Sequence, residues 1–189
     1  MNRCEWAGDQ AIYIRYHDHE WGVPVHNDKK LFEMLVLEGA QAGLSWITVL
    51  KKRSGYRKAF DRFEPEKIAR YGPGKVEALM ADPGIIRNRL KINAAIQNAR
   101  AYLDLREGAG TLNEFLWQFT GGEPVVNSWA SSGQAPASTP VSEAMSKSLK
   151  KRGFRFVGPT ICYAFMQAVG IVNDHTTSCF RYTEIIDQY

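Results

Sequence analysis

Two cysteines and two histidines near the ends of the 189-residue chain constrain its fold more than any other feature. They are Cys4 and His17 near the start, and His175 and Cys179 near the finish. Two thiolates and two imidazoles form a donor set that Zn2+ prefers in closed tetrahedral sites. A metal held by all four would join the two ends of the chain and leave no open coordination position. Such a site would be structural rather than catalytic.

The spacing within these pairs leaves an alternative open. On a helix, His175 and Cys179 would lie on one face, and the segment between Cys4 and His17 is long enough to loop back. In the alternative, Cys4 is a free thiol at a frayed end and the histidines serve elsewhere. The pattern is looser than a CxxC…CxxC motif, so it indicates zinc without requiring it.

Size and composition restrict the class of protein. A chain with 44% hydrophobic residues suits one unit over residues 1–189, built as one or two helical lobes. Its apolar runs are short and interrupted by charges, and its start lacks the apolar core of a signal peptide, so no membrane association is expected. Three cysteines argue against a disulfide framework and favour the cytoplasm. A net charge of +4 permits a polyanionic partner.

Helix signals dominate the chain and the alternation typical of strands is nearly absent, so the predicted fold class is all-α. The expected helices cover 28–42, 45–52, a short stretch from 65, 73–82, 88–107, 112–119, 141–151 and 159–169. Residues 128–139 are rich in Ser, Ala, Gly and Pro. We predict a mobile surface loop or a lobe junction there.

The last two predicted helices flank a glycine-bounded turn. Gly153 suits the left-handed position after a helix, and Pro159, after Gly158, suits a first helical turn. The basic residues Lys151 and Arg152 lie beside this turn, which is typical of a helix-hairpin-helix that binds the DNA backbone. The alternative is an ordinary αα-hairpin whose basic residues serve solubility. The side chains expected to pack between the helices are Phe154, Phe156 and Val157.

A carboxylate lies on the apolar stripe of the helix predicted over 28–42. Glu38 shares this stripe with Leu31 and Leu35, and a buried unpaired carboxylate is costly, so it needs donors or a cavity. Alternatively, it pairs with a lysine or arginine or lies at the edge of the stripe. The aromatic residues concentrated in the first quarter of the chain are Trp6, Tyr13, Tyr16, Trp21 and Trp46. Flat rings beside a carboxylate suit a planar base with a donor edge.

Several long stretches resemble the DNA-3-methyladenine glycosylase I family. They are Tyr13–Pro24, Leu37–Leu50, Gly84–Arg87, Lys91–Ile92, Asn98–Tyr102, Lys150–Gly158, and Asn173–His175 with Cys179. The resemblance runs from Arg3 to about Cys179. It implies a helix-hairpin-helix glycosylase fold in which Cys4, His17, His175 and Cys179 hold one structural Zn2+ between the N- and C-terminal segments.

The resemblance also implies an activity. A monomeric base-excision enzyme would flip 3-methyladenine out of alkylated double-stranded DNA and hydrolyse its N-glycosidic bond, leaving an abasic site without a lyase step. It would need no nucleotide cofactor. A second possibility is a zinc-stapled DNA-binding module without chemistry, and a weaker third is a catalytic zinc hydrolase with an open ligand position.

The same resemblance assigns roles to individual residues. Gly43 and Leu44 would fill the gap left in the duplex, where an apolar wedge is suitable. The flipped base would lie among Trp6, Tyr16, Trp21 and Trp46, with Tyr13 and Glu38 at its polar edge. Glu38 would bind and polarise the base. The backbone contacts of the hairpin would come from Lys151, Arg152, Gly153 and Gly158. No acid follows the hairpin in its second helix, so the activation of water is unassigned.

Overall fold

The chain is described by a computed structural model over residues 1–187, and it is mostly helical. The α-helices are α1 (Ala11–His19), α2 (Asp28–Gln41), α3 (Trp46–Ala59), α4 (Pro65–Ile68), α5 (Pro73–Ala81), α6 (Arg89–Ala109), α7 (Leu112–Trp117), α8 (Pro140–Lys151), α9 (Pro159–Ala168) and α10 (Phe180–Ile186). Short 3-10 helices are η1 (Glu5–Ala7), η2 (Asp61–Phe63), η3 (Gln118–Thr120) and η4 (Ser132–Gln134). Within residues 1–187, none of the helices combines the length and the apolar character that a membrane span requires.

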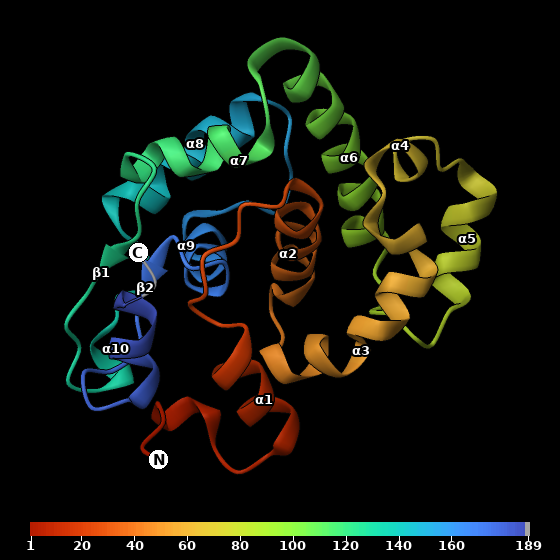
Figure 1. Cartoon of the computed structure of the whole chain (residues 1–189). Coiled ribbons are helices and arrows are strands. Elements are labelled where there is room, and N and C mark those ends of the chain that lie inside the picture. Colours follow the sequence, from red (N-terminus) through yellow and green to blue (C-terminus); the bar gives the residue numbers. More distant parts are fainter. Residues whose placement is uncertain (188–189) are drawn as a thin grey trace.

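Helix α2 lies at the centre of the molecule, with α7 and α9 on one side and α3 and α6 on the other (Figure 1). It begins where the Asn27 side chain accepts a hydrogen bond of 3.0 Å from the Lys30 backbone N–H. Every residue from 31 to 40 is buried. The prediction of a single apolar stripe is therefore wrong, because helices pack around α2 on several sides. This central position draws two carboxylates, Glu33 and Glu38, into the interior.

Most of the predicted helices are present, with three differences. Helix α3 continues to Ala59, beyond the predicted end at Lys52. Helices α1 and α10 were not predicted, because both are short and lack a regular apolar stripe. Tertiary packing stabilises them, since each contributes buried side chains to the core, including Tyr16 from α1 and Ile185 from α10.

Two short strands modify the all-α prediction. Strand β1 (Val125–Val126) pairs in parallel with β2 (Val172–Asn173), with Val125 opposite Val172. Two-residue strands are too short for an alternating pattern to reveal them. After β2 the chain forms a loop that carries His175, and Cys179 is the N-cap of α10. The helical arrangement considered for His175 and Cys179 is therefore not the one that forms.

Helices α8 and α9 form the expected hairpin. Gly153 has a φ of +89°, and its N–H donates to Lys150 O while that of Phe154 donates to Leu149 O. These two bonds define a Schellman motif, which ends α8. Phe154 and Val157 are buried as predicted.

Phe156 departs from the prediction that it packs between α8 and α9. It has a φ of +53° and lies against Gly39 of α2, where a Cβ atom would come within 3.2 Å of the Phe156 Cβ atom. The hairpin turn thus rests directly on the central helix.

Hydrogen bonds from Asn127 and Trp129 hold the start of the segment 128–139, for which the sequence predicts a mobile loop or a lobe junction. Asn127 Nδ2 and Trp129 Nε1 donate to Asp174 Oδ1 at 2.6 and 2.8 Å. The carbonyl of Trp129 also accepts from the Thr177 N–H at 2.9 Å. These contacts tie the segment to the loop that follows β2.

Candidate metal centre and adjoining cavity

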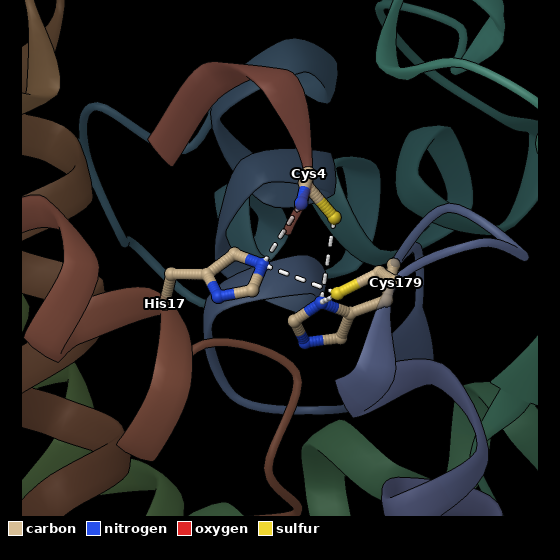
Figure 2. A group of neighbouring side chains, drawn as sticks. Cys4, His17 and Cys179 are labelled. Atoms are coloured by element: carbon tan, nitrogen blue, oxygen red, sulfur yellow. Dashed lines mark hydrogen bonds between the residues drawn. The ribbon is translucent and has the colours of Figure 1, made fainter. Parts of the chain in front are cut away.

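Cys4, His17, His175 and Cys179 converge although they come from opposite ends of the chain. One potential ligand atom from each lies within 4.8 Å of all the others, and all four side chains are buried. Figure 2 shows the sulfur atoms and imidazole nitrogens pointing toward one another. Cys179 Sγ lies 3.4 Å from His17 Nε2, and both sulfur atoms lie 3.5 Å from His175 Nδ1. Two sulfur and two nitrogen donors in this arrangement could hold a metal ion.

The outward nitrogen of each imidazole is held by a neighbour. His17 Nδ1 lies 2.8 Å from Asp18 Oδ1, and His175 Nε2 lies 3.0 Å from the Trp21 carbonyl oxygen. Arg3 donates to Asp18 at 2.8 Å and, with His17, lowers the pKa of that carboxyl to about 2. These partners leave Nε2 of His17 and Nδ1 of His175 directed into the cluster, as in metal sites with ordered outer partners.

The two thiols have opposite acid–base properties. Hydrogen bonding to Cys4, and then to His17 and His175, lowers the pKa of Cys179. Hydrogen bonding to Cys179, together with burial, raises the pKa of Cys4. A divalent cation that bound both sulfur atoms would require both thiols to lose their protons. The Thr176 N–H, 3.4 Å from Cys4 Sγ, adds a donor suited to a thiolate.

The cluster adjoins a cavity of about 330 Å3, to which it is linked through the lining residues Trp6 and Trp21. Trp21 packs edge-on against His175 with ring centroids 4.6 Å apart, and Trp6 packs against Trp21 at 4.9 Å. Trp6 lies two residues after Cys4, in η1. The four candidate metal ligands are therefore linked to the wall of the cavity through Trp6 and Trp21.

All six residues predicted for a base pocket line this cavity. They are Trp6, Tyr13, Tyr16, Trp21, Glu38 and Trp46. The rings of Tyr16 and Trp46 are tilted at 47° with centroids 5.4 Å apart. The Tyr13 hydroxyl accepts a 3.0 Å hydrogen bond from the Ile47 N–H, which fixes α1 to the start of α3.

Glu38 is the unpaired carboxylate of the cavity. It is 3% exposed, and within residues 1–187 its side chain makes no hydrogen bond or ion pair. Burial raises its pKa to about 8. Glu33, on the same helix, is also buried but binds Arg53 and Arg57 at 2.9 and 2.8 Å. The alternative prediction for Glu38 was an ion pair with a basic residue. Over the described part of the chain, the structure has such ion pairs at Glu33 and not at Glu38.

Residues that were not predicted complete the cavity. They are Gln41, Ser132, Ala135, Ala164, Gln167 and Asp174. Asp174 accepts four hydrogen bonds of 2.6 to 2.8 Å from Asn127, Trp129, Tyr163 and Gln167. Because each oxygen already has two donors, this carboxylate organises the wall and is poorly suited to activate water. Its position next to His175 was the only feature of the sequence that could have indicated a role for Asp174 in the cavity.

A second hollow of about 320 Å3 lies beside the first and shares Glu38 and Gln41 with it. Gly43 and Leu44 line this hollow, at the turn between α2 and α3. Gly43 has a φ of +76°, and Leu44 is 42% exposed. Leu44 is therefore an exposed apolar side chain next to the cavity. This is the position in which a wedge that enters the duplex would be required.

The hairpin presents free backbone donors. Within residues 1–187, the N–H groups of Phe156, Val157 and Gly158 donate to no other residue. Lys151 is exposed beside them, whereas the Arg152 guanidinium lies over the Phe115 ring at 4.9 Å. Free N–H groups at a helix start attract anions.

A larger groove of about 870 Å3 borders the other side of the hairpin turn. Its lining includes Arg89, Arg100 and Arg155, and its one carboxylate, Glu77, is paired with Arg89 at 2.6 Å. Among the described residues, its lining offers neither an unpaired acid nor an enclosing aromatic wall. We therefore regard the smaller, aromatic cavity as the ligand site.

Known proteins are similar to this chain in sequence and in overall structure. Residues 6–182 match the family model described as methyladenine glycosylase. The chain is 54% identical to DNA-3-methyladenine glycosylase 1 of Escherichia coli (strain K12), over 96% of this chain and 97% of that protein. The crystal structure of a 3-methyladenine DNA glycosylase I superposes with a TM-score of 0.93 at 54% identity, covering 95% of this chain and 98% of that one. Another enzyme of this name, in complex with 3-methyladenine, superposes with a TM-score of 0.92 at 36% identity, covering 95% and 97%.

Proposed function

Because this chain belongs to the methyladenine glycosylase family, we propose that it flips 3-methyladenine out of alkylated duplex DNA and hydrolyses its N-glycosidic bond. The product would be an abasic site, since no lyase step is required. The observation that carries this proposal is the unpaired Glu38 in an aromatic cavity. A flipped base is recognised by stacking and by hydrogen bonds at its polar edge, and this cavity offers both.

Glu38 selects the methylated base through hydrogen bonding and charge. An ionised carboxylate accepts hydrogen bonds from the exocyclic amine of adenine, whereas guanine presents a carbonyl oxygen there. Methylation at N3 makes the base in DNA cationic, and a nearby cation favours the ionised acid. Since the pKa of Glu38 is about 8 in the free protein, a cationic base would ionise it and a neutral adenine would not.

The cation formed by methylation also makes the base a good leaving group. The enzyme therefore needs mainly to orient the base and to exclude normal adenine. Tyr16 and Trp46 supply flat surfaces for stacking, and Trp6 and Trp21 close the cavity toward the metal cluster.

We propose that the cluster of Cys4, His17, His175 and Cys179 holds one structural Zn2+. The donor set fits this ion, and four protein ligands leave no position for a reacting water. Its chemistry would be limited to fixing the ends of the chain and, through Trp6 and Trp21, the wall of the cavity.

The DNA contacts follow from the surface around the cavity. We propose that α8 and α9 act as a helix-hairpin-helix, in which the free N–H groups of the turn and Lys151 bind phosphates. Leu44 would insert into the duplex where the base has left. Arg152 would contribute less, because its guanidinium is already placed over Phe115.

The proposal is tested by measuring the release of free bases from methylated duplex DNA. We expect the wild type to release 3-methyladenine selectively and Glu38→Gln to lower kcat/KM by about ten- to a hundredfold, as for a lost buried charged hydrogen bond. Glu123→Gln, at an exposed acid that does not line the cavity, serves as the control. Near-normal excision by Glu38→Gln would refute the role of Glu38. A folded, metal-loaded wild type that binds DNA but releases no base would instead indicate a binding module.

A further inference from the structure

The turn that carries Leu44 is held by a lysine from another helix. Helix α2 ends at Gln41, so its last carbonyl groups lack partners within the helix. Lys91, near the start of α6, donates from Nζ to Ala40 O at 2.8 Å and to Ala42 O at 2.6 Å. A cation at a helix C-terminus also interacts favourably with the helix dipole.

The remaining carbonyl groups of this turn are satisfied locally. Gly39 O accepts from the Ala42 N–H at 3.4 Å, and Gln41 O accepts from the Leu44 N–H at 2.6 Å. Lys91 therefore completes the hydrogen bonding of the turn between Gly39 and Ala42. Without its ammonium group, the carbonyls of Ala40 and Ala42 would turn toward water, and the turn would lose its only long-range polar contacts within residues 1–187.

We propose that Lys91 is a positioning residue that holds Leu44 in the orientation required to enter the duplex. This inference rests on the proposed wedge function of Leu44. Lys91 acts through the backbone, because its Nζ is already bound to two carbonyl groups and its side chain is half-buried. It connects the wedge to α6, the same helix whose Asn98 binds the hairpin turn.

The test compares Lys91→Met with a matched lysine. Methionine keeps most of the apolar stem and removes the donors. Lys52→Met is the control, because Lys52 Nζ also donates to a backbone carbonyl, that of Pro83, at 2.6 Å but away from the wedge. The readouts are the excision rate, the fluorescence of 2-aminopurine placed opposite the damaged base, and the affinity for free 3-methyladenine.

We expect Lys91→Met to lower excision by about tenfold or more, as for loss of two charge-assisted hydrogen bonds. The 2-aminopurine signal of insertion should fall in parallel, while affinity for the free base changes less than about twofold and Lys52→Met behaves as wild type. Normal excision and insertion by Lys91→Met would overturn the proposal. Equal loss of free-base affinity would also overturn it, because Lys91 would then support the whole fold.

Two further outcomes separate this inference from others. If Lys91→Met keeps a normal insertion signal but reduces the salt dependence of binding by about one ion, Lys91 is a phosphate contact and the proposal is wrong. Leu44→Ala tests the premise independently. If Leu44→Ala excises and inserts like the wild type, Leu44 is not a wedge, and the role proposed for Lys91 fails with it. If Leu44→Ala is impaired but Lys91→Met is normal, only the role of Lys91 is overturned.

Discussion

Among single residues, the contrast between Glu33 and Glu38 is the most informative. Both are buried on α2, but Glu33 is neutralised by arginines and Glu38 borders a cavity without a partner. A carboxylate kept in this state costs stability, and such a cost is typical of a functional site. The charge state of Glu38 should therefore be visible in the stability of the protein.

We expect the stability of the wild type to fall relative to Glu38→Gln as the pH rises from about 4.5 to 8. The unfolded chain releases the Glu38 proton near pH 4.5, whereas the folded chain retains it up to about pH 8. Between these values the native state binds the extra proton, so rising pH favours unfolding. Across this range the difference in stability should change by a few kcal/mol in favour of Glu38→Gln, because each tenfold change in proton affinity corresponds to about 1.4 kcal/mol.

Urea unfolding of both proteins across this pH range measures the effect. Other titrating groups cancel in the difference between the two curves. Parallel curves from about pH 4.5 to above pH 8 would show that Glu38 does not titrate abnormally.

At the scale of elements, α6 organises the hairpin through one buried side chain. Asn98 Nδ2 donates to Arg155 O at 3.0 Å, and the Arg155 N–H donates to Asn98 Oδ1 at 2.7 Å. This pair satisfies both backbone groups of a residue in the turn. The turn is thereby held against α6 without a covalent link.

We expect Asn98→Leu to lower stability by about 2–4 kcal/mol, because it leaves two backbone groups without partners. Affinity for duplex DNA should fall as the hairpin loses its orientation. Thermal unfolding and a DNA titration measure the two effects, and Asn93→Ala, exposed on the same helix, controls for stability. If Asn98→Leu is destabilised but its affinity for DNA is unchanged, the orientation of the hairpin does not contribute to DNA binding.

Across the whole molecule, the ends of the chain meet at the cluster of Cys4, His17, His175 and Cys179. The Asn2 side chain donates to Ser178 O at 3.0 Å, and Asn2 O accepts from the Phe180 N–H at 3.0 Å. Figure 1 shows the N-terminal segment beside α10. Because Trp6 follows Cys4 closely in η1, loss of the cluster should disturb the cavity as well as the termini.

We expect Cys4→Ser to lose the bound Zn2+ and to be destabilised by at least a few kcal/mol, or roughly 2–4 °C in Tm for each kcal/mol. Affinity for free 3-methyladenine should fall with it. Metal analysis, thermal unfolding and base titration provide the readouts. Cys162→Ser is the control, because Cys162 is a buried thiol outside the cluster. Full metal content in Cys4→Ser would refute the proposed ligand set.

Local signals in the sequence were enough to predict the family, most of the helices and the aromatic residues of the cavity. Helix caps and glycine turns act within a few residues, as at Asn27 and Gly153, and they were sufficient for α2 and the end of α8. The family resemblance rested on long motifs, and the family match confirms it.

Which polar groups are paired, and how distant segments meet, depends on the folded chain. Nothing local distinguishes Glu33 from Glu38, because the arginines that neutralise Glu33 come from α3. The same is true of Lys91, whose partners lie at the end of another helix, and of Asp174, whose four donors are spread over several elements. Helix propensity and capping act over a few residues, whereas burial and hydrogen-bond partners depend on the packing of the whole chain.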